Sequence, residues 1–237
     1  MIQAAIIGFG RFGELFKRHQ SEYFSFITYR RSMPENEIQD FLEKLQYCDY
    51  IFFSVPISAM EKSSLAVKDY VKPHATLVDL CSVKEYPMEV LGKYFHQNEI
   101  IGAHPLFGPE SAADGFAGHQ IITVKPKTES PTYDRLKSIW ESLQVSIIEM
   151  TAEEHDRHMA WTLCLTQFIG RGLSTLPLPE NGIGTKGYFD LHAIVRRAEA
   201  DTIQLFNDMN LYNRFSTEMR DAVSKRFAEL NEQFPGK

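Results

Sequence analysis

The sequence predicts an α/β protein in which a mostly parallel sheet is followed by a smaller, all-helical part. Three observations support this fold class. Short apolar runs alternate with amphipathic helical segments up to residue 150, as in βαβ units. A glycine-rich turn joins the first apolar run to the first helical segment. From residue 151 onward apolar residues recur at helical spacing, without a further strand signal. We therefore expect two domains, 1–150 and 151–237.

The individual elements follow from the same patterns. Strands are expected where short apolar or β-branched runs are bounded by turn residues, at 4–7, 24–29, 49–53, 75–79, 98–103, 120–124 and 145–150. In the N-terminal part, helices are expected from residue 14 and at 35–46, 60–71, 84–94 and 130–143. Pro73 stops the third of these, and Pro87 is tolerated in the first turn of the fourth. The C-terminal part is expected to contain helices at 153–173, 184–206 and 209–234.

Composition excludes several classes of protein. The chain has 237 residues, of which 43% are hydrophobic and 24% charged, which is ordinary for a globular protein. A formal net charge of −6 argues against nucleic acid as a partner. No uncharged apolar run approaches the ~18 residues that cross a bilayer. The apolar start also lacks a basic n-region, so we expect neither membrane association nor a signal peptide. Three scattered cysteines favour the reducing cytoplasm and offer no metal-ligand pair.

The segment Gly8-Phe-Gly-Arg-Phe-Gly13 is a dinucleotide-binding motif in the context that makes it specific, because it closes a strand and opens a helix. Gly8 allows the tight turn, Gly10 lets the backbone approach a pyrophosphate, and Gly13 permits close packing of helix on strand. The N–H groups of the first helical turn, which includes Arg11 and Phe12, would face the anion. These residues predict a Rossmann-type domain.

Cofactor choice is indicated by the end of the second strand. An NAD site normally places Asp or Glu there, whereas this sequence has Arg30, Arg31 and Ser32. Guanidinium groups match a phosphate monoester, so we expect NADP, with NAD possible; the alternative is a solvated basic turn. Ser54 and Ser58 follow the third strand and are further candidates for cofactor contact.

His104 is the candidate catalytic residue. It follows the strand 98–103 and opens a loop stiffened by proline and glycine, which ends at Ser111. Ligands of open α/β sheets bind outside the carboxyl ends of the strands, and histidine is suited to proton transfer near neutral pH.

Taken in order, the polar motifs of the chain resemble those of the prephenate/arogenate dehydrogenase family of tyrosine biosynthesis, and especially its plant-type arogenate dehydrogenase branch. The resemblance extends from residue 2 to about 215. It depends on Gly8-Phe-Gly-Arg-Phe-Gly13, Asp79-Leu-Cys-Ser-Val-Lys-Glu85, Ala103-His-Pro-Leu-Phe-Gly-Pro-Glu-Ser111, Glu153-Glu-His-Asp-Arg157 and Gly184-Thr-Lys-Gly-Tyr188.

This resemblance implies an NAD(P)-dependent oxidative decarboxylation of prephenate or arogenate, in which hydride passes to nicotinamide, carbon dioxide leaves and the ring becomes aromatic. It implies no metal. His104 matches the catalytic histidine, and Ser82 matches the serine that orients it. The resemblance places the following residues at the substrate: Lys84, which borders the pocket; His155 and Asp156, a polar pair from the helical domain; and Arg196 for the carboxylates, with Arg197, Arg157 and Arg171 as alternatives.

Some questions stay open at this level. Asp156 or Glu110 would favour arogenate by facing its ammonium group, but the choice between the two substrates is undecided. Neither a tyrosine-regulatory domain nor a chorismate mutase segment is expected. The small helical part is expected to form a C2 homodimer. Competing hypotheses are a dehydrogenase of the hydroxyacid or imine type, a non-catalytic NADP-binding protein, and a structural dimerisation module.

Overall fold

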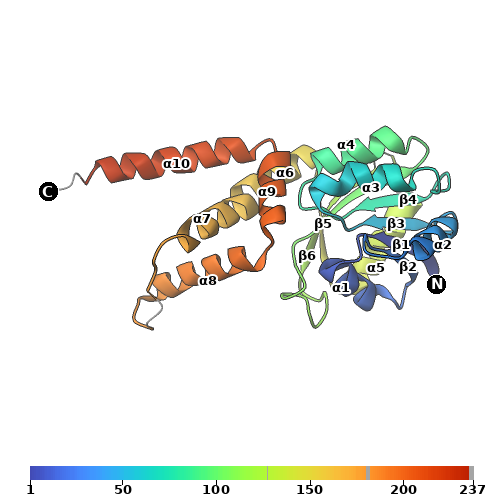
Figure 1. Cartoon of the computed structure of the whole chain (residues 1–237), viewed down its shortest axis with the longest axis horizontal. Helices are drawn as coiled ribbons and strands as arrows, with labels where there is room; N and C mark the ends of the chain where they lie inside the picture. Colours follow the sequence, from blue (N-terminus) through green and yellow to red (C-terminus); the bar gives the residue numbers. More distant parts are fainter. Residues whose placement is uncertain (127, 180–181, 235–237) are drawn as a thin grey trace. The chain divides into compact units, whose positions relative to one another are not determined.

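The computed structural model describes residues 1–126, 128–179 and 182–234, and the chain divides into two compact units, Met1–His155 and Asp156–Lys237 (Figure 1). The division falls after His155, whereas the sequence predicts a boundary after residue 150. Each unit is described by itself.

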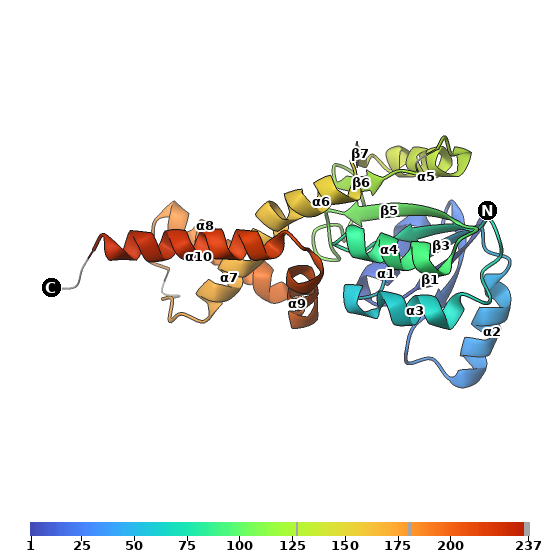
Figure 2. The ribbon, with the colours of Figure 1, turned by 90° about the horizontal axis from the view of Figure 1, so that it is seen from above.

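The first unit contains a seven-stranded sheet of order β2-β1-β3-β4-β5-β6-β7. All neighbouring strands are parallel except β5 and β6, which are antiparallel. Figure 2 shows this order from β7 at one edge towards β3 and β1. The mostly parallel, Rossmann-type fold is therefore confirmed. The strands are β1 Ile2–Ile7, β2 Phe24–Tyr29, β3 Tyr50–Phe53, β4 Thr76–Asp79, β5 Glu99–Pro105, β6 Gln120–Val124 and β7 Ser146–Glu149.

Helices cover both faces of this sheet. They are α1 Arg11–Gln20, α2 Glu35–Leu45, α3 Met60–Val67 with a 3-10 turn Ile57–Ala59 before it, α4 Glu85–Tyr94 and α5 Pro131–Ser142. Phe16 of α1 and Trp140 of α5 belong to one core cluster with strand residues such as Phe52. Figure 1 shows α3 and α4 on the opposite side of the strands. Burial on both faces explains why every residue of β3 and β4 is buried and why β3 is an uninterrupted apolar and aromatic run.

Strand β5 is longer than predicted, and this difference positions the candidate site. The expected strand ended at residue 103, but β5 continues through His104 and Pro105. Strand β4 ends at Asp79, opposite Gly102, so the last three residues of β5 extend beyond their neighbour. The antiparallel β6 pairs with β5 as far as Pro105 and holds this overhang on its other side. His104 therefore lies in a strand and not in the loop after it.

The second unit is all-helical within its described residues. Helix α6, Ala152–Met159, enters it and continues as a π-helical turn, Ala160–Cys164. Then follow α7 Leu165–Ser174, α8 Lys186–Ala200, α9 Ile203–Tyr212 and α10 Ser216–Glu232. Helices α7 and α8 pack closely at Gly170, where a Cβ would lie 2.6 Å from the Cβ of Ala198.

Two predicted helix boundaries in this unit were wrong. The expected helix 184–206 ends at Ala200, because the Thr202 hydroxyl accepts a hydrogen bond from Leu205 N (3.1 Å) and begins a new helix. The expected helix 209–234 begins only at Ser216, after a turn at Asn213. None of the helices within the described ranges is both long and apolar enough to cross a membrane.

Candidate active site

The glycine turn after β1 has the geometry of an anion site. Gly8 has φ of +96°, and a Cβ there would overlap the backbone carbonyl of Ser54, so this position requires glycine. Gly8 N and Phe9 N both donate to Tyr29 O, at 2.9 and 2.8 Å, and fix the turn. Nothing lies within 4 Å of a Cβ built on Gly10, and α1 begins without a side-chain cap. The first helical turn thus has no side-chain cap, and there is open space beside Gly10, which fits a pyrophosphate.

The other candidate cofactor residues follow neighbouring strands at the same edge of the sheet. The chain passes from β1 to β2 on one side and then returns to β3 on the other side of β1. This reversal of strand order creates the crevice where ligands of such sheets bind. Arg30, Arg31 and Ser32 follow β2 and are exposed. Neither guanidinium forms an ion pair with any residue that the structure describes. Ser54 is half-buried after β3, whereas Ser58 is exposed in the 3-10 turn.

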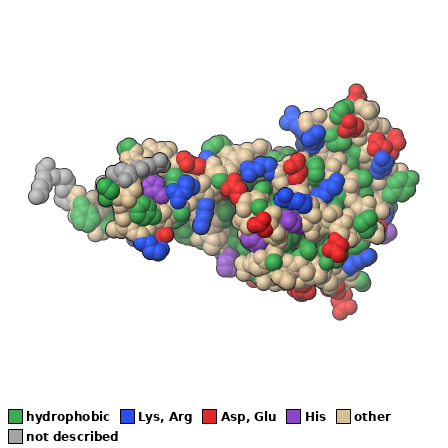
Figure 3. All heavy atoms as spheres, turned by 90° about the horizontal axis from the view of Figure 1, so that it is seen from below, with side chains coloured by type: hydrophobic (Ala, Val, Ile, Leu, Met, Phe, Trp, Pro, Cys, Tyr) green, Lys and Arg blue, Asp and Glu red, His purple; other side chains and the backbone are tan. Residues whose placement is uncertain are grey.

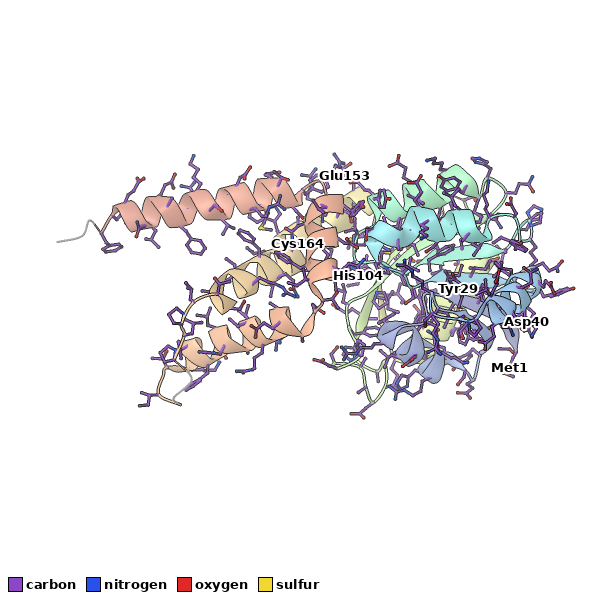
Figure 4. The ribbon with its side chains drawn as sticks, in the orientation of Figure 1. Met1, Tyr29, Asp40, His104, Glu153 and Cys164 are labelled. Carbon is purple, nitrogen blue, oxygen red and sulfur yellow. The ribbon has the colours of Figure 1, made fainter. Side chains whose placement is uncertain are left out.

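His104 lies at the carboxyl end of β5, and Met1 lies at the opposite end of the sheet's strands (Figure 4). The residue is only 4% exposed, and its Nδ1 lies 2.8 Å from Nε2 of His155, with an angle of 66° between the two ring planes. His155 is positioned by the start of α6. There Thr151 and Glu154 form a capping box: Glu154 N donates to the Thr151 hydroxyl (3.2 Å), and Thr151 N donates to the Glu154 carboxylate (2.8 Å).

The surroundings of His104 keep its imidazole neutral. Burial lowers the pKa of His104 well below its ordinary value, and His155 and the ammonium of Lys84 act in the same direction. A neutral imidazole has one donor and one acceptor nitrogen. When Nδ1 donates to His155, Nε2 carries the free lone pair. The pair can therefore hold His104 in the tautomer that accepts a proton at Nε2.

Two residues expected near His104, Ser82 and Lys84, have surroundings that the sequence did not predict. Among the described residues, the hydrogen-bond partner of His104 is His155, and Ser82 makes no hydrogen bond to it. Lys84 was expected at the substrate, but its side chain is completely buried. Its Nζ donates to Ala103 O (2.7 Å) and to the Asp79 carboxylate. The ammonium is thus committed inside the protein, because a buried lysine requires an internal counter-ion.

Sequence reasoning missed Asp79 as a partner in this site. Asp79 ends β4 and is fully buried, and its Oδ1 also accepts a hydrogen bond from Cys81 N (2.8 Å). The available signal was an acidic residue at the carboxyl end of a buried strand, five positions before a lysine. Burial raises the pKa of Asp79, and Lys84 opposes that rise.

The loop that follows β5 packs on the cofactor helix α1. Phe107 lies 6.2 Å from Phe12, measured between ring centroids. His19 Nε2 is 3.3 Å from Ala113 O, and the exposed Arg11 and Glu110 form an ion pair at 3.3 Å. The predicted cofactor residues Arg11 and Phe12 thus also contact the segment that follows His104.

The predicted residues of the second unit are dispersed within it. Asp156 is fully buried, and Asn213 Nδ2 donates to its backbone carbonyl (2.7 Å). Arg196 and its neighbour Arg197 are exposed on α8. The remaining alternatives are engaged locally: Arg157 lies over the ring of Phe215, and Arg171 donates to the carbonyl of Asp201 and lies over Phe206. Across the described residues there is no group of three or more His, Cys, Asp or Glu that could hold a metal ion.

Comparison with known proteins places this geometry in context. The family model "Prephenate dehydrogenase, nucleotide-binding domain" matches residues 29–149, and "TYRAAT1-like, C-terminal domain" matches residues 172–237. The whole chain aligns with two proteins of Arabidopsis thaliana: Arogenate dehydrogenase 1, chloroplastic, at 29% identity over 40% of that protein, and Arogenate dehydrogenase 2, chloroplastic, at 26% identity over 71%. The chain therefore spans less than half of the first relative.

A solved structure shares the fold. Prephenate dehydrogenase from A. aeolicus, in complex with hydroxyphenyl propionate and NAD+, has a TM-score of 0.73, with 98% of this chain and 90% of that chain covered. The sequences are 19% identical.

Proposed function

The chain belongs to the prephenate dehydrogenase family, whose nucleotide-binding model covers just over half of it, and we propose that it catalyses the NADP-dependent oxidative decarboxylation of prephenate or arogenate. The observation that carries this proposal is the placement of His104. It is a buried, neutral imidazole at the carboxyl end of β5, with Nδ1 held by His155 and Nε2 left to accept a proton.

The proposed chemistry assigns a task to each part of the first unit. His104 accepts the proton of the ring hydroxyl at Nε2, and His155 holds the imidazole in the required tautomer. Bound NADP would supply the hydride acceptor, and loss of carbon dioxide leaves a phenol. The glycine turn and the first turn of α1 bind the pyrophosphate through backbone N–H groups. Arg30 and Arg31, which have no described ion-pair partner, bind the 2′-phosphate.

Steady-state kinetics on the purified chain test this proposal. Formation of reduced nicotinamide is followed with prephenate and with arogenate, each with NADP and with NAD. We expect turnover of at least one of the two substrates, with preference for NADP. Cofactor binding without turnover of either would support a non-catalytic NADP-binding protein. Turnover of a panel of hydroxyacids or imines instead would support the related dehydrogenase class.

The cytoplasmic location of the protein stays a prediction.

We extend the proposal to a homodimer formed by the helical unit. This unit contains nine of the fourteen large apolar side chains that are exposed in the described residues, and Figure 3 shows apolar groups on one face of it. Helix α10 has its last buried residue at Met219, yet Phe227 and Leu230 further along are 58% and 50% exposed. A helical unit this small gains a larger core by pairing with a second copy.

The oligomeric state tests this extension. Phe227→Asp with Leu230→Asp is expected to shift the protein from dimer to monomer in light scattering or sedimentation. Ser224→Asp, an exposed position on the same helix, is the matched control. A monomeric unmodified chain would rule out the dimer.

A further inference from the structure

The overhang of β5 leaves a gap beside the residue that precedes His104. Strand β4 ends opposite Gly102, so it offers no residue opposite Ala103. A backbone carbonyl inside a protein needs a hydrogen-bond donor. Lys84 provides it, because its Nζ lies 2.7 Å from Ala103 O. A side chain thus takes the place of the missing strand at the peptide group that leads into His104.

This lysine is held in place from several directions. Its ammonium forms an ion pair with the Asp79 carboxylate, and both side chains are completely buried. It also lies 3.4 Å from the backbone carbonyl of Asp79. The residue directly precedes α4, so its backbone is fixed by the helix. Its aliphatic stem passes over Gly102, where a Cβ would lie 3.2 Å from Lys84 Cδ. Glycine at 102 therefore leaves room for the lysine to reach the overhang.

We propose that the buried Asp79–Lys84 ion pair is a positioning element for His104, which fixes the β5 overhang through Ala103 and presents a positive charge that keeps the imidazole a proton acceptor. The catalytic part of this inference rests on the proposed function. Both side chains are completely buried, so we assign the pair a positioning role and not a contact with the reacting atoms.

The electrostatic part follows from the groups that face His104. Within the described part of the first unit these are His155 from α6 and Lys84, with its partner Asp79, from the connection between β4 and α4. The ammonium opposes a second positive charge on the imidazole and so lowers the pKa of His104. Without Lys84 this opposing charge is lost, and the pKa of His104 is expected to rise. A higher pKa makes His104 hold a proton over a wider range of acid pH, where it can no longer accept one.

Three variants separate this role from a general effect on stability. Lys84→Met removes the cation alone. Asp79→Asn with Lys84→Met removes both charges and keeps an oxygen for the hydrogen bond from Cys81 N. The control is Lys93→Met on α4, whose ammonium forms an exposed ion pair with Glu61.

The decisive measurement is an NMR titration of His104 in the full chain labelled with isotope-enriched histidine, which needs no substrate. We expect the pKa of His104 to rise both in Lys84→Met and in the paired variant, and to stay unchanged in Lys93→Met. We also expect kcat to fall by ~10- to 100-fold in Lys84→Met, as for a catalytic group displaced by about 1 Å, with an unchanged Kd for NADP. The acid limb of the kcat/KM profile should move to higher pH.

An unchanged pKa of His104 in Lys84→Met would overturn the inference. If Lys84→Met does not fold, the paired variant decides. A pKa and a tautomer of His104 equal to those in the unmodified chain would overturn the inference, whereas loss of the single tautomer would support it. A failure of the proposed function is distinguishable, because the unmodified chain would then turn over neither substrate while the titration still gives its answer.

Discussion

Replacement of His104 by asparagine tests the proposed base with little change to its surroundings. The amide of asparagine occupies about the space of Cγ and Nδ1 of the imidazole, so it can keep a hydrogen bond to His155 Nε2 while Nε2 of His104 is lost. His104→Ala removes both. His155→Ala leaves the ring of His104 and removes the partner of its Nδ1.

The expected losses differ between these variants. A positioned general base contributes ~10²–10⁴ to turnover, so His104→Asn should reduce kcat by that factor. One hydrogen bond contributes about 0.5–1.5 kcal/mol net, which corresponds to roughly 2- to 13-fold, so His155→Ala should have a much smaller effect. His104→Ala should lose at least as much as His104→Asn. The Kd for NADP should stay nearly constant in all three, because the glycine turn does not contact His104 in the described hydrogen bonds.

The assay is initial-rate formation of reduced nicotinamide at saturating cofactor, combined with a fluorescence titration of NADP. Unchanged kcat in His104→Asn would remove His104 from the mechanism. Equal losses in His155→Ala and His104→Asn would refute the division of roles, since the contact between the two rings would then account for the whole effect.

Three further predictions concern the cofactor site and stability. Arg30→Ala with Arg31→Ala should raise the Kd of NADP much more than that of NAD, measured by titration calorimetry; equal losses would mean that the arginines do not bind the 2′-phosphate. Gly8→Ala should lower both the melting temperature and the affinity for either cofactor, because the added Cβ meets the Ser54 carbonyl at a position with positive φ. The control is Gly172→Ala on α7, where the added Cβ lies in open space; it should raise the free energy of unfolding by about 0.5–1 kcal/mol. The pKa of His104 in the folded chain lies below its unfolded value of about 6.5, so the unfolded chain binds more protons at acid pH. The free energy of unfolding should therefore fall as pH decreases below about 6.5. Chemical denaturation at several pH values should show a smaller fall in His104→Asn than in the unmodified chain.

The sequence predicts the sheet well because its central strands are buried on both faces. An apolar run such as Tyr50–Phe53 admits few other interpretations. The extension of β5 was missed because Pro105 normally ends a strand, whereas here it is paired with Ile121 of β6. The break before α9 carried a local signal, Thr202 as N-cap, which the helical periodicity obscured.

The candidate site was predicted less completely, for a physical reason. The glycine turn is a local motif, so its geometry follows from adjacent residues. The contact between His104 and His155 joins positions 51 residues apart, and its geometry depends on how β5 and α6 pack. Lys84 was expected at the substrate because of its position in the family motif Asp79-Leu-Cys-Ser-Val-Lys-Glu85. Its burial with Asp79 depends on the three-dimensional arrangement of β4 and β5.

The aromatic contact between Phe12 and Phe107 has a consequence for how variants of this chain should be interpreted. It joins the helix that begins at the glycine turn to the segment that directly continues the β5 overhang. A substitution such as Phe12→Ala is therefore not a clean probe of dinucleotide affinity, because it also loosens the chain two to three residues beyond His104. Affinity and turnover will change together in such a variant, although Phe12 itself has no part in proton transfer.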